Sequence, residues 1–131
     1  MVELVWDLSR VGTATAPSGT SLTVGDNASV SPSDLLAMAV AGCHMRTFLD
    51  LAGQAGVPVL SYAATAHVEA DATPAPRVDL RVFVVSSGAH DHARIAALVE
   101  QAARVSPVAR ALGDRVRMHA DVHLLTRAAT G

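Results

Sequence analysis

The chain has 131 residues, of which 50% are hydrophobic and 17% charged, and its formal net charge is −2 at pH 7. This composition excludes a disordered chain, and the length suits one modest core, so we expect a single domain over residues 1–131. Without a basic face, we expect no nucleic acid partner. No signal peptide or membrane-length apolar run is evident, so we expect no membrane contact and a cytoplasmic protein.

The N-terminal part of the chain has the pattern of short strands joined by turns. Apolar and polar residues alternate in residues 2–6, and threonine and alanine alternate in residues 12–16. The pair Ser18-Gly19 favours a turn into a third short strand over residues 21–24. This part therefore predicts a small β-unit.

A long helix is predicted next, with clear signals at its start. Ser31 suits the N-cap, Pro32 the first helical position, and Asp34 the acidic position of a capping box. The helix is apolar on all sides over residues 35–43, so it must be covered on both sides. A single sheet layer cannot do this. A second copy of the chain is the economical cover, and we expect a homodimer.

The rest of the chain predicts a hairpin, two helices and a last strand. In order, these cover residues 64–84, 90–104, 106–113 and 115–125. The hairpin strands alternate apolar with polar side chains on either side of the turn Pro74-Ala75-Pro76. Strands, a long helix, a hairpin, helices and a strand indicate an α+β fold with mainly antiparallel pairing.

Two histidine patterns have metal-ligand character, but each has a simpler interpretation. His119, Asp121 and His123 alternate along the last strand and therefore point to one face. We interpret them as polar residues on the solvent-exposed face of that strand, because no fourth ligand is evident. The run His90-Asp91-His92 is interpreted as a helix start, where an acid favours the helix dipole. We expect no metal and no organic cofactor.

Other common chemistries lack their motifs. The chain has no Gly-x-Ser-x-Gly elbow and no lysine for a phosphate-binding loop. Cys43 is the only cysteine, and it lies inside the apolar helix. It cannot form a disulfide within the chain, which fits a reducing cytoplasm. The residues alone leave two interpretations open: a small buried hydrophobe or a nucleophile.

The helix sequence supports a family resemblance. Residues 31–43 read Ser-Pro-x-Asp-Leu-Leu-Ala-x-Ala-x-Ala-Gly-Cys, and a hairpin, an amphipathic helix and Ser106-Pro107-Val108 follow in order. This arrangement resembles the OsmC/Ohr family of thiol-dependent hydroperoxide reductases, on its OsmC-like side, over nearly the whole chain. The resemblance implies an α+β fold with an antiparallel sheet and a long central helix. It also implies an intertwined homodimer with the catalytic pocket at the subunit interface.

The resemblance assigns roles to four positions. Cys43 matches the cysteine that attacks the peroxide, and Arg10, in Arg10-Val11-Gly12, matches the arginine that holds it as thiolate. Two positions depart from the family. Ser106 stands where the resolving cysteine is expected, and Ser33, with Asp34 next to it, stands where a glutamate orients the arginine.

Another arginine, Arg46, follows Cys43 by three residues on the same helix. It could replace Arg10 as the cation beside the thiolate, although a solvated ion pair with Asp50 is the simpler interpretation.

The sequence thus predicts a one-cysteine peroxidase in oxidative stress defence. It would reduce small organic hydroperoxides with Cys43, and an external thiol would clear the sulfenic acid, because Ser106 cannot form a disulfide. The alternative is a non-catalytic protein of the OsmC fold that binds a small apolar or electrophilic ligand.

Overall fold

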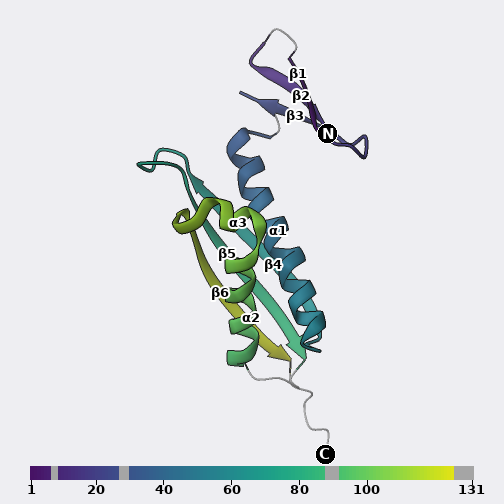
Figure 1. The fold of residues 1–131 in the computed structure, drawn as a ribbon, viewed down its shortest axis with the longest axis vertical. Coiled ribbons are helices and arrows are strands. Elements are labelled where there is room, and N and C mark those ends of the chain that lie inside the picture. The colour runs from purple at the N-terminus through teal and green to yellow at the C-terminus, as the bar shows by residue number, and fades with distance from the viewer. Residues whose placement is uncertain (7–8, 27–29, 88–91, 126–131) are drawn as a thin grey trace, which may run out of the picture. The chain divides into compact units, whose positions relative to one another are not determined.

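The structure is a computed structural model, and it describes residues 1–6, 9–26, 30–87 and 92–125. The chain divides into two compact units, residues 1–36 and 37–131, with the division inside the long helix. The elements in order are β1 (Glu3–Trp6), β2 (Val11–Thr15), β3 (Ser21–Gly25), α1 (Pro32–Gln54), β4 (Val59–Glu69), β5 (Arg77–Ser87), α2 (His92–Val105), α3 (Pro107–Leu112), a 3₁₀ turn (Gly113–Arg115) and β6 (Val116–Leu125) (Figure 1). The single domain over residues 1–131 stays a prediction.

The first unit is an antiparallel meander with strand order β1-β2-β3. The three predicted strands are therefore confirmed. The predicted turn between β2 and β3 contains Gly19 at φ 91°, a backbone conformation that glycine adopts without steric cost. Two backbone hydrogen bonds between Ala16 and its neighbours Gly19 and Thr20 close this turn.

The second unit is built on a sheet with strand order β4-β5-β6. β4 and β5 pair antiparallel as a hairpin, whereas β5 and β6 pair parallel. The fold class is α+β as predicted, with β6 as the exception to antiparallel pairing. The exception has a topological cause, because a chain that passes through two helices between strands can return in the same direction.

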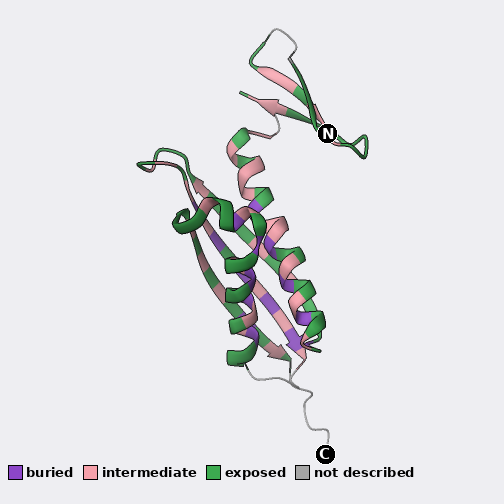
Figure 2. Cartoon of the chain, viewed as in Figure 1, coloured by how far each residue is buried: buried purple, intermediate pink, exposed green. Residues whose placement is uncertain are grey.

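The helices cover one face of this sheet and enclose the core. α1 and α2 lie over the same side of the strands (Figure 1). Val78, Leu80, Val82 and Val84 alternate along β5 and are at most 1% exposed, which is the buried half of the predicted alternation. Figure 2 shows these buried positions beneath the helices.

α2 turns an apolar stripe toward the core. The spacing of Ile95, Leu98, Val99 and Ala102 predicts this stripe, and all four are fully buried except Leu98, which is half-buried. The predicted start of this helix at His90, with Asp91, lies outside the described residues, and α2 is described from His92.

α1 begins at Pro32 as the sequence predicts, but it is buried on fewer sides than expected. Val40, His44, Phe48 and Ala52 recur every four residues and are the buried residues of the helix. Within residues 35–43, the segment expected to be covered on all sides, only Val40 is buried in the single chain.

The expectation that no apolar run reaches membrane length is wrong for α1. By length and composition this helix could cross a membrane. The core helix of a soluble protein passes the same test, and α1 supplies a buried stripe to the core of the second unit. We therefore interpret α1 as a core helix.

Candidate functional site

The start of α1 is fixed by the predicted capping box. The backbone N–H of Asp34 donates to Ser31 Oγ, and the backbone N–H of Ser31 donates to Asp34 Oδ2, both at 3.1 Å. These two bonds satisfy donors that a helix end leaves free. The carboxylate of Asp34 is thereby engaged at the cap, beside the predicted carboxylate position at Ser33, which is half-buried.

Cys43 is half-buried and opens into a cavity of about 240 Å³. The other lining residues are Arg46, Thr47, Asp50 and Pro107. The residues from α1 follow one another at helical spacing, so they lie on one face of that helix. Pro107 is the first residue of α3, which places the start of that helix at the mouth of the cysteine cavity.

The guanidinium of Arg46 is not neutralised in this cavity. Arg46 and Asp50 are both exposed, and among the described residues the two form no ion pair. The simpler interpretation of Arg46, as the partner of Asp50, is therefore not what the structure shows.

Ser106 is the N-cap residue of α3, and its side chain is fully buried. Its hydroxyl makes no capping bond and has no hydrogen-bond partner in the described part of the chain. The helix start is held instead by the backbone, since Ser106 N–H donates to the carbonyl of Ala102 and Arg110 N–H donates to that of Ser106. Ser106 therefore occupies the N-cap position of α3, but its side chain does not cap the helix.

Arg10 lies in the first unit and is held by a carboxylate that the sequence analysis missed. Its Nε forms an ion pair with Asp26 Oδ2, and the backbone N–H of Asp26 donates to the Arg10 carbonyl at 3.0 Å. In the antiparallel pair of β2 and β3, Val11 lies opposite Gly25. The residue before Val11, Arg10, and the residue after Gly25, Asp26, therefore also lie opposite each other, so the strand register could have predicted their ion pair.

The same region forms an apolar cavity of about 370 Å³. It is lined by Leu4, Ser9, Arg10, Val11, Gly12, Val24, Gly25 and Pro32. A Cβ at Gly25 would lie 2.2 Å from the carbonyl oxygen of Arg10, so only glycine fits at this approach. Arg10 belongs to residues 1–36 and Cys43 to residues 37–131, and their pairing stays a prediction.

A buried aromatic cluster begins at the residue after Cys43. His44 is 1% exposed, its Nε2–H donates to the Val99 carbonyl at 2.9 Å, and its Nδ1 accepts from the Tyr62 hydroxyl at 2.7 Å. The ring also stacks on Phe48, with centroids 6.3 Å apart. These contacts join α1 to β4 and α2, and they fix the rotation of α1 that turns Cys43 into its cavity.

The environment of this cluster disfavours charge. Burial lowers the pKa of His44 from 6.5, and the hydrogen bond to Val99 only partly opposes this. Burial raises the pKa of Tyr62 to about 12. Both groups are therefore neutral at pH 7. The sequence signal for the cluster was a histidine and a phenylalanine four residues apart on one helix, next to the cysteine.

The histidines of the last strand lie on the outer side of the sheet. His119, Asp121 and His123 are exposed along one face of β6. Within residues 1–6, 9–26, 30–87 and 92–125, no three histidine, cysteine or acidic side chains are placed to hold a metal ion. The run that starts at His90 is described only from His92.

Comparison with known proteins identifies one family. The sequence model of the OsmC-like protein family matches residues 25–120. This segment contains the capping box of α1, Cys43 and Ser106. No curated protein matches the sequence.

Solved structures share the fold at low sequence identity. An OsmC-like protein of Mycoplasma pneumoniae is 14% identical, with a TM-score of 0.79 over 95% of this chain and 96% of its own. An OsmC-like protein of unknown function from Vibrio cholerae is 19% identical, with a TM-score of 0.76 over 92% and 97%. An organic hydroperoxide resistance protein from Legionella pneumophila is 17% identical, with a TM-score of 0.70 over 94% and 95%.

Proposed function

The chain belongs to the OsmC-like protein family, and from this premise we propose that it is a thiol-dependent peroxidase that reduces organic hydroperoxides. The observation that carries the proposal is the half-buried Cys43, which opens into a cavity whose lining includes Arg46. A buried, inert cysteine would have neither an opening nor a cation beside it. The names of structural neighbours from Legionella pneumophila and Bacillus subtilis, both organic hydroperoxide resistance proteins, agree with this reaction class.

The reaction runs through one cysteine. The Cys43 thiolate attacks the outer oxygen of the hydroperoxide, the O–O bond breaks, and the alkoxide leaves as the alcohol after taking up a proton. The sulfur becomes a sulfenic acid. Because the chain has no second cysteine, one external thiol condenses with the sulfenic acid and releases water. A second external thiol then frees Cys43 and leaves as the disulfide. This need for thiol reductant supports a cytoplasmic location.

Two arginines are candidates for the cation that stabilises the thiolate. Arg10 is the arginine that the family resemblance implies. Asp26 forms an ion pair with it, which is the role that the resemblance gives to a glutamate at position 33. Arg46 shares the cavity of Cys43. We assign the primary role to Arg10, acting across the subunit interface, and a supporting role to Arg46.

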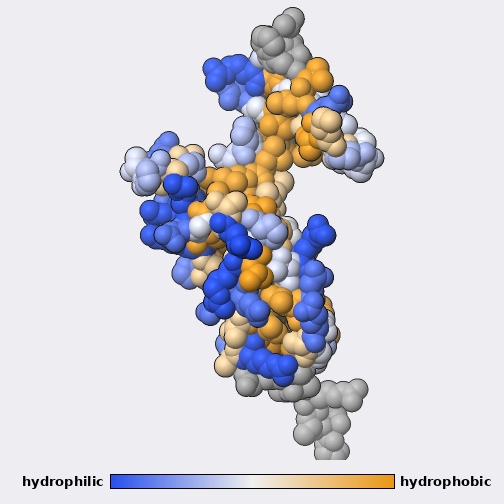
Figure 3. All heavy atoms as spheres, viewed as in Figure 1, coloured by the Kyte–Doolittle hydropathy of each residue, from blue (hydrophilic) through white to orange (hydrophobic). Residues whose placement is uncertain are grey.

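The second subunit in this proposal is supported by an apolar seam on α1. The seam consists of Leu35, Met38, Gly42, Met45 and Leu49, which repeat at intervals of three and four residues as in paired helices. Met38 is 57% exposed and Leu49 42% exposed in the single chain. Figure 3 shows apolar side chains gathered over the first half of α1.

The first unit also exposes apolar side chains that a second subunit could bury. Leu4 and Val5 of β1 are 67% and 64% exposed, and Leu22 of β3 is 41% exposed. A three-stranded meander with such side chains in water is poorly stable alone. An intertwined homodimer would bury both this surface and the seam on α1.

The alternative function is non-catalytic binding of a small apolar or electrophilic ligand. The apolar cavity of about 370 Å³ at Arg10 favours it, since this space is larger than the cavity at Cys43. In that case the ion pair with Asp26 would be structural, and Cys43 would only be a wall residue of its own, smaller cavity.

Consumption of cumene hydroperoxide by the reduced protein, with dithiothreitol as external thiol, tests the proposal. We expect turnover that Cys43→Ser abolishes and Arg10→Ala lowers by about tenfold or more, because the arginine charge would no longer stabilise the attacking sulfur. Arg46→Ala should lower it less. Alkylation of Cys43 across pH should show the same order.

Two outcomes would contradict the proposal. Turnover that survives Cys43→Ser would place the chemistry elsewhere. Absence of turnover in the folded wild-type protein, together with saturable binding of cumene alcohol, would favour the binding function. The matched control is Arg104→Ala on α2, which lies outside both cavities.

A further inference from the structure

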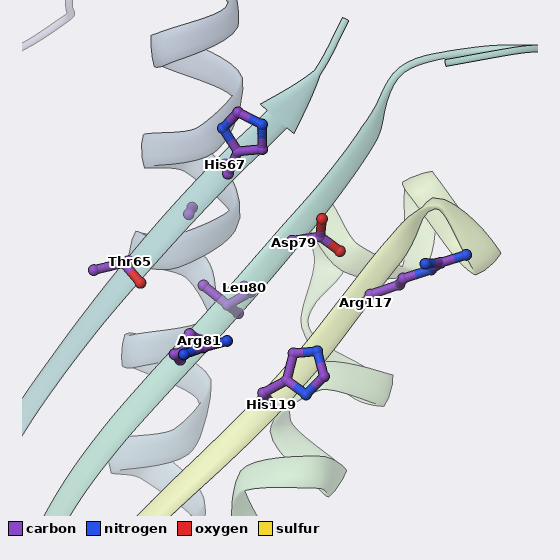
Figure 4. Close-up of a pocket in the computed structure, with 8 residues that line it drawn as sticks. Thr65, His67, Asp79, Leu80, Arg81, Arg117 and His119 are labelled. Carbon is purple, nitrogen blue, oxygen red and sulfur yellow. The ribbon is translucent and has the colours of Figure 1, made fainter.

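The face of the β4-β5-β6 sheet that points away from the helices carries a polar cluster. Its side chains rise from three neighbouring strands, and the helices lie behind the sheet (Figure 4). They surround a shallow cavity of about 450 Å³. The polar members are Thr65, His67, Asp79, Arg81, Arg117 and His119.

Strand register sets these residues in two adjacent rows. In one row Asp79 of β5 is flanked by His67 of β4 and Arg117 of β6. In the next row Arg81 of β5 is flanked by His119 of β6 and by a threonine of β4. Arg81 and Arg117 are thus diagonal neighbours on parallel strands. Their Cα atoms are about 8 Å apart, because neighbouring strands lie about 4.8 Å apart and two residues along a strand span about 6.6 Å. Two guanidinium groups at that spacing can reach a common anion.

The two arginines have no acid bound to them. In the described part of the chain, neither Arg81 nor Arg117 forms an ion pair. In the adjoining row of the same face, Arg77 lies 3.9 Å from Glu69. The sheet therefore pairs one arginine with an acid and leaves two others free around a cavity.

We propose that this cluster is a binding site for inorganic phosphate in its monohydrogen form. Arg81 and Arg117 supply planar donor forks that match phosphate oxygens. His67 and His119 add ring N–H donors at either side. The two guanidinium groups outnumber the one carboxylate, so these three side chains together leave an excess of one positive charge.

Asp79 determines which anion the cluster prefers. A carboxylate only accepts hydrogen bonds, so it repels an anion that has no proton. Monohydrogen phosphate carries one P–OH group that can donate to Asp79, whereas sulfate carries none near neutral pH. The cluster should therefore bind phosphate more tightly than sulfate. The next row of the face adds only Asp121 as a further acid on β6.

This site is separate from the cysteine chemistry. Cys43 lies on a helix that covers the opposite face of the sheet. Binding at the outer face and turnover of hydroperoxide can therefore be measured independently.

Titration of isotope-labelled protein with inorganic phosphate, followed by amide chemical shifts, tests the site. We expect saturable shifts at residues 65–67, 79–81 and 117–119, with sulfate at least about tenfold weaker. Arg81→Gln and Arg117→Gln should each weaken phosphate binding about tenfold or more, because each removes a charged donor fork. Asp79→Asn should remove the preference for phosphate over sulfate.

The matched control is Arg77→Gln, which removes an arginine from the same face but one already paired with Glu69. Its phosphate affinity should stay within about twofold of wild type. Shifts that do not saturate, equal affinity for phosphate and sulfate in wild type, or an equal loss in Arg77→Gln would each overturn the proposal. Hydroperoxide turnover should be the same in Arg117→Gln as in wild type, so failure of either proposal leaves the other standing.

Discussion

Two buried serines differ in what their hydroxyls contact. Ser86 and Ser106 are both fully buried, but Ser86 Oγ–H donates to the Pro58 carbonyl at 2.5 Å, whereas Ser106 Oγ has no partner in the described residues. An unmade hydrogen bond in a protein interior is costly, by about 1–3 kcal/mol. Position 106 therefore suits a weakly polar thiol or a methyl group better than a hydroxyl.

Replacement by alanine should destabilise the fold at Ser86 but not at Ser106. Ser106→Ala should leave the free energy of unfolding unchanged or raise it by about 1 kcal/mol, because it removes an unpaired polar group. Ser86→Ala, the matched control, should lower it by about 1 kcal/mol, because it removes a bonded hydroxyl. Urea unfolding followed by circular dichroism measures both. Destabilisation by Ser106→Ala as large as that by Ser86→Ala would show that the Ser106 hydroxyl has a partner in solution.

His44 makes the stability of the fold depend on pH. Burial lowers its pKa in the folded state from 6.5, so below that value the unfolded chain binds a proton that the folded chain resists. Stability is therefore full above about pH 6.5 and falls as the pH decreases, by at most about 1.4 kcal/mol per pH unit.

Urea unfolding from about pH 7.5 to about pH 5.5 measures this dependence. His44→Gln should be less stable at neutral pH, since it loses the ring contacts with Phe48 and Tyr62, and its stability should depend less on pH. His92→Gln is the control, because His92 is exposed at the start of α2. The same steep loss in His44→Gln as in wild type would assign the effect to another group.

At the scale of elements, α1 carries two different stripes. One stripe, at every fourth residue from Val40, packs into the core of the second unit. The other is the seam from Leu35 to Leu49, which the single chain leaves partly exposed. Cys43 belongs to neither stripe and opens into its own cavity. The buried stripe, the exposed seam and the cysteine therefore lie at different angles around the helix axis.

The contribution of the capping box of α1 to stability can be measured by comparing Ser31 with its neighbour Ser33. Ser31→Ala should lower the free energy of unfolding by about 1 kcal/mol, because it leaves the N–H of Asp34 without its acceptor. Ser33→Ala is the matched control, as Ser33 lies in the same turn and makes no capping bond. Thermal unfolding followed by circular dichroism compares the two. Equal losses would mean that the box contributes nothing beyond local serine propensity.

At the scale of the whole molecule, the exposed apolar surface predicts association. Met45→Glu places a charge in the seam on α1, where a paired helix would have to bury it, so this variant should be monomeric or poorly folded. Wild type should sediment as a dimer. Leu125→Glu is the matched control, since Leu125 is 60% exposed on β6 and outside the seam. A monomeric wild type at micromolar concentration, or a dimeric Met45→Glu, would contradict the seam as the interface.

The sequence by itself determined the features that depend on near neighbours. The capping residues Ser31, Pro32 and Asp34 act within one helical turn, so their pattern predicted the start of α1. Strand alternation and the helical stripe of α2 repeat within a few residues, and the α+β fold class followed from their order. The ordered run to Cys43 and on to Ser106 was enough to indicate the family.

Only the tertiary structure decided the features that join distant segments. His44 bonds to Tyr62 and Val99, 18 and 55 residues away, and no local pattern encodes such a pairing. Within the described residues, Arg46 has no ion pair and the Ser106 hydroxyl has no hydrogen bond, while β6 pairs parallel to β5. These features likewise follow from how the elements pack and cross. The periodicity of apolar residues predicts which side of a helix or strand is buried. Which residues pack against that side depends on strand register and on packing between distant parts of the chain.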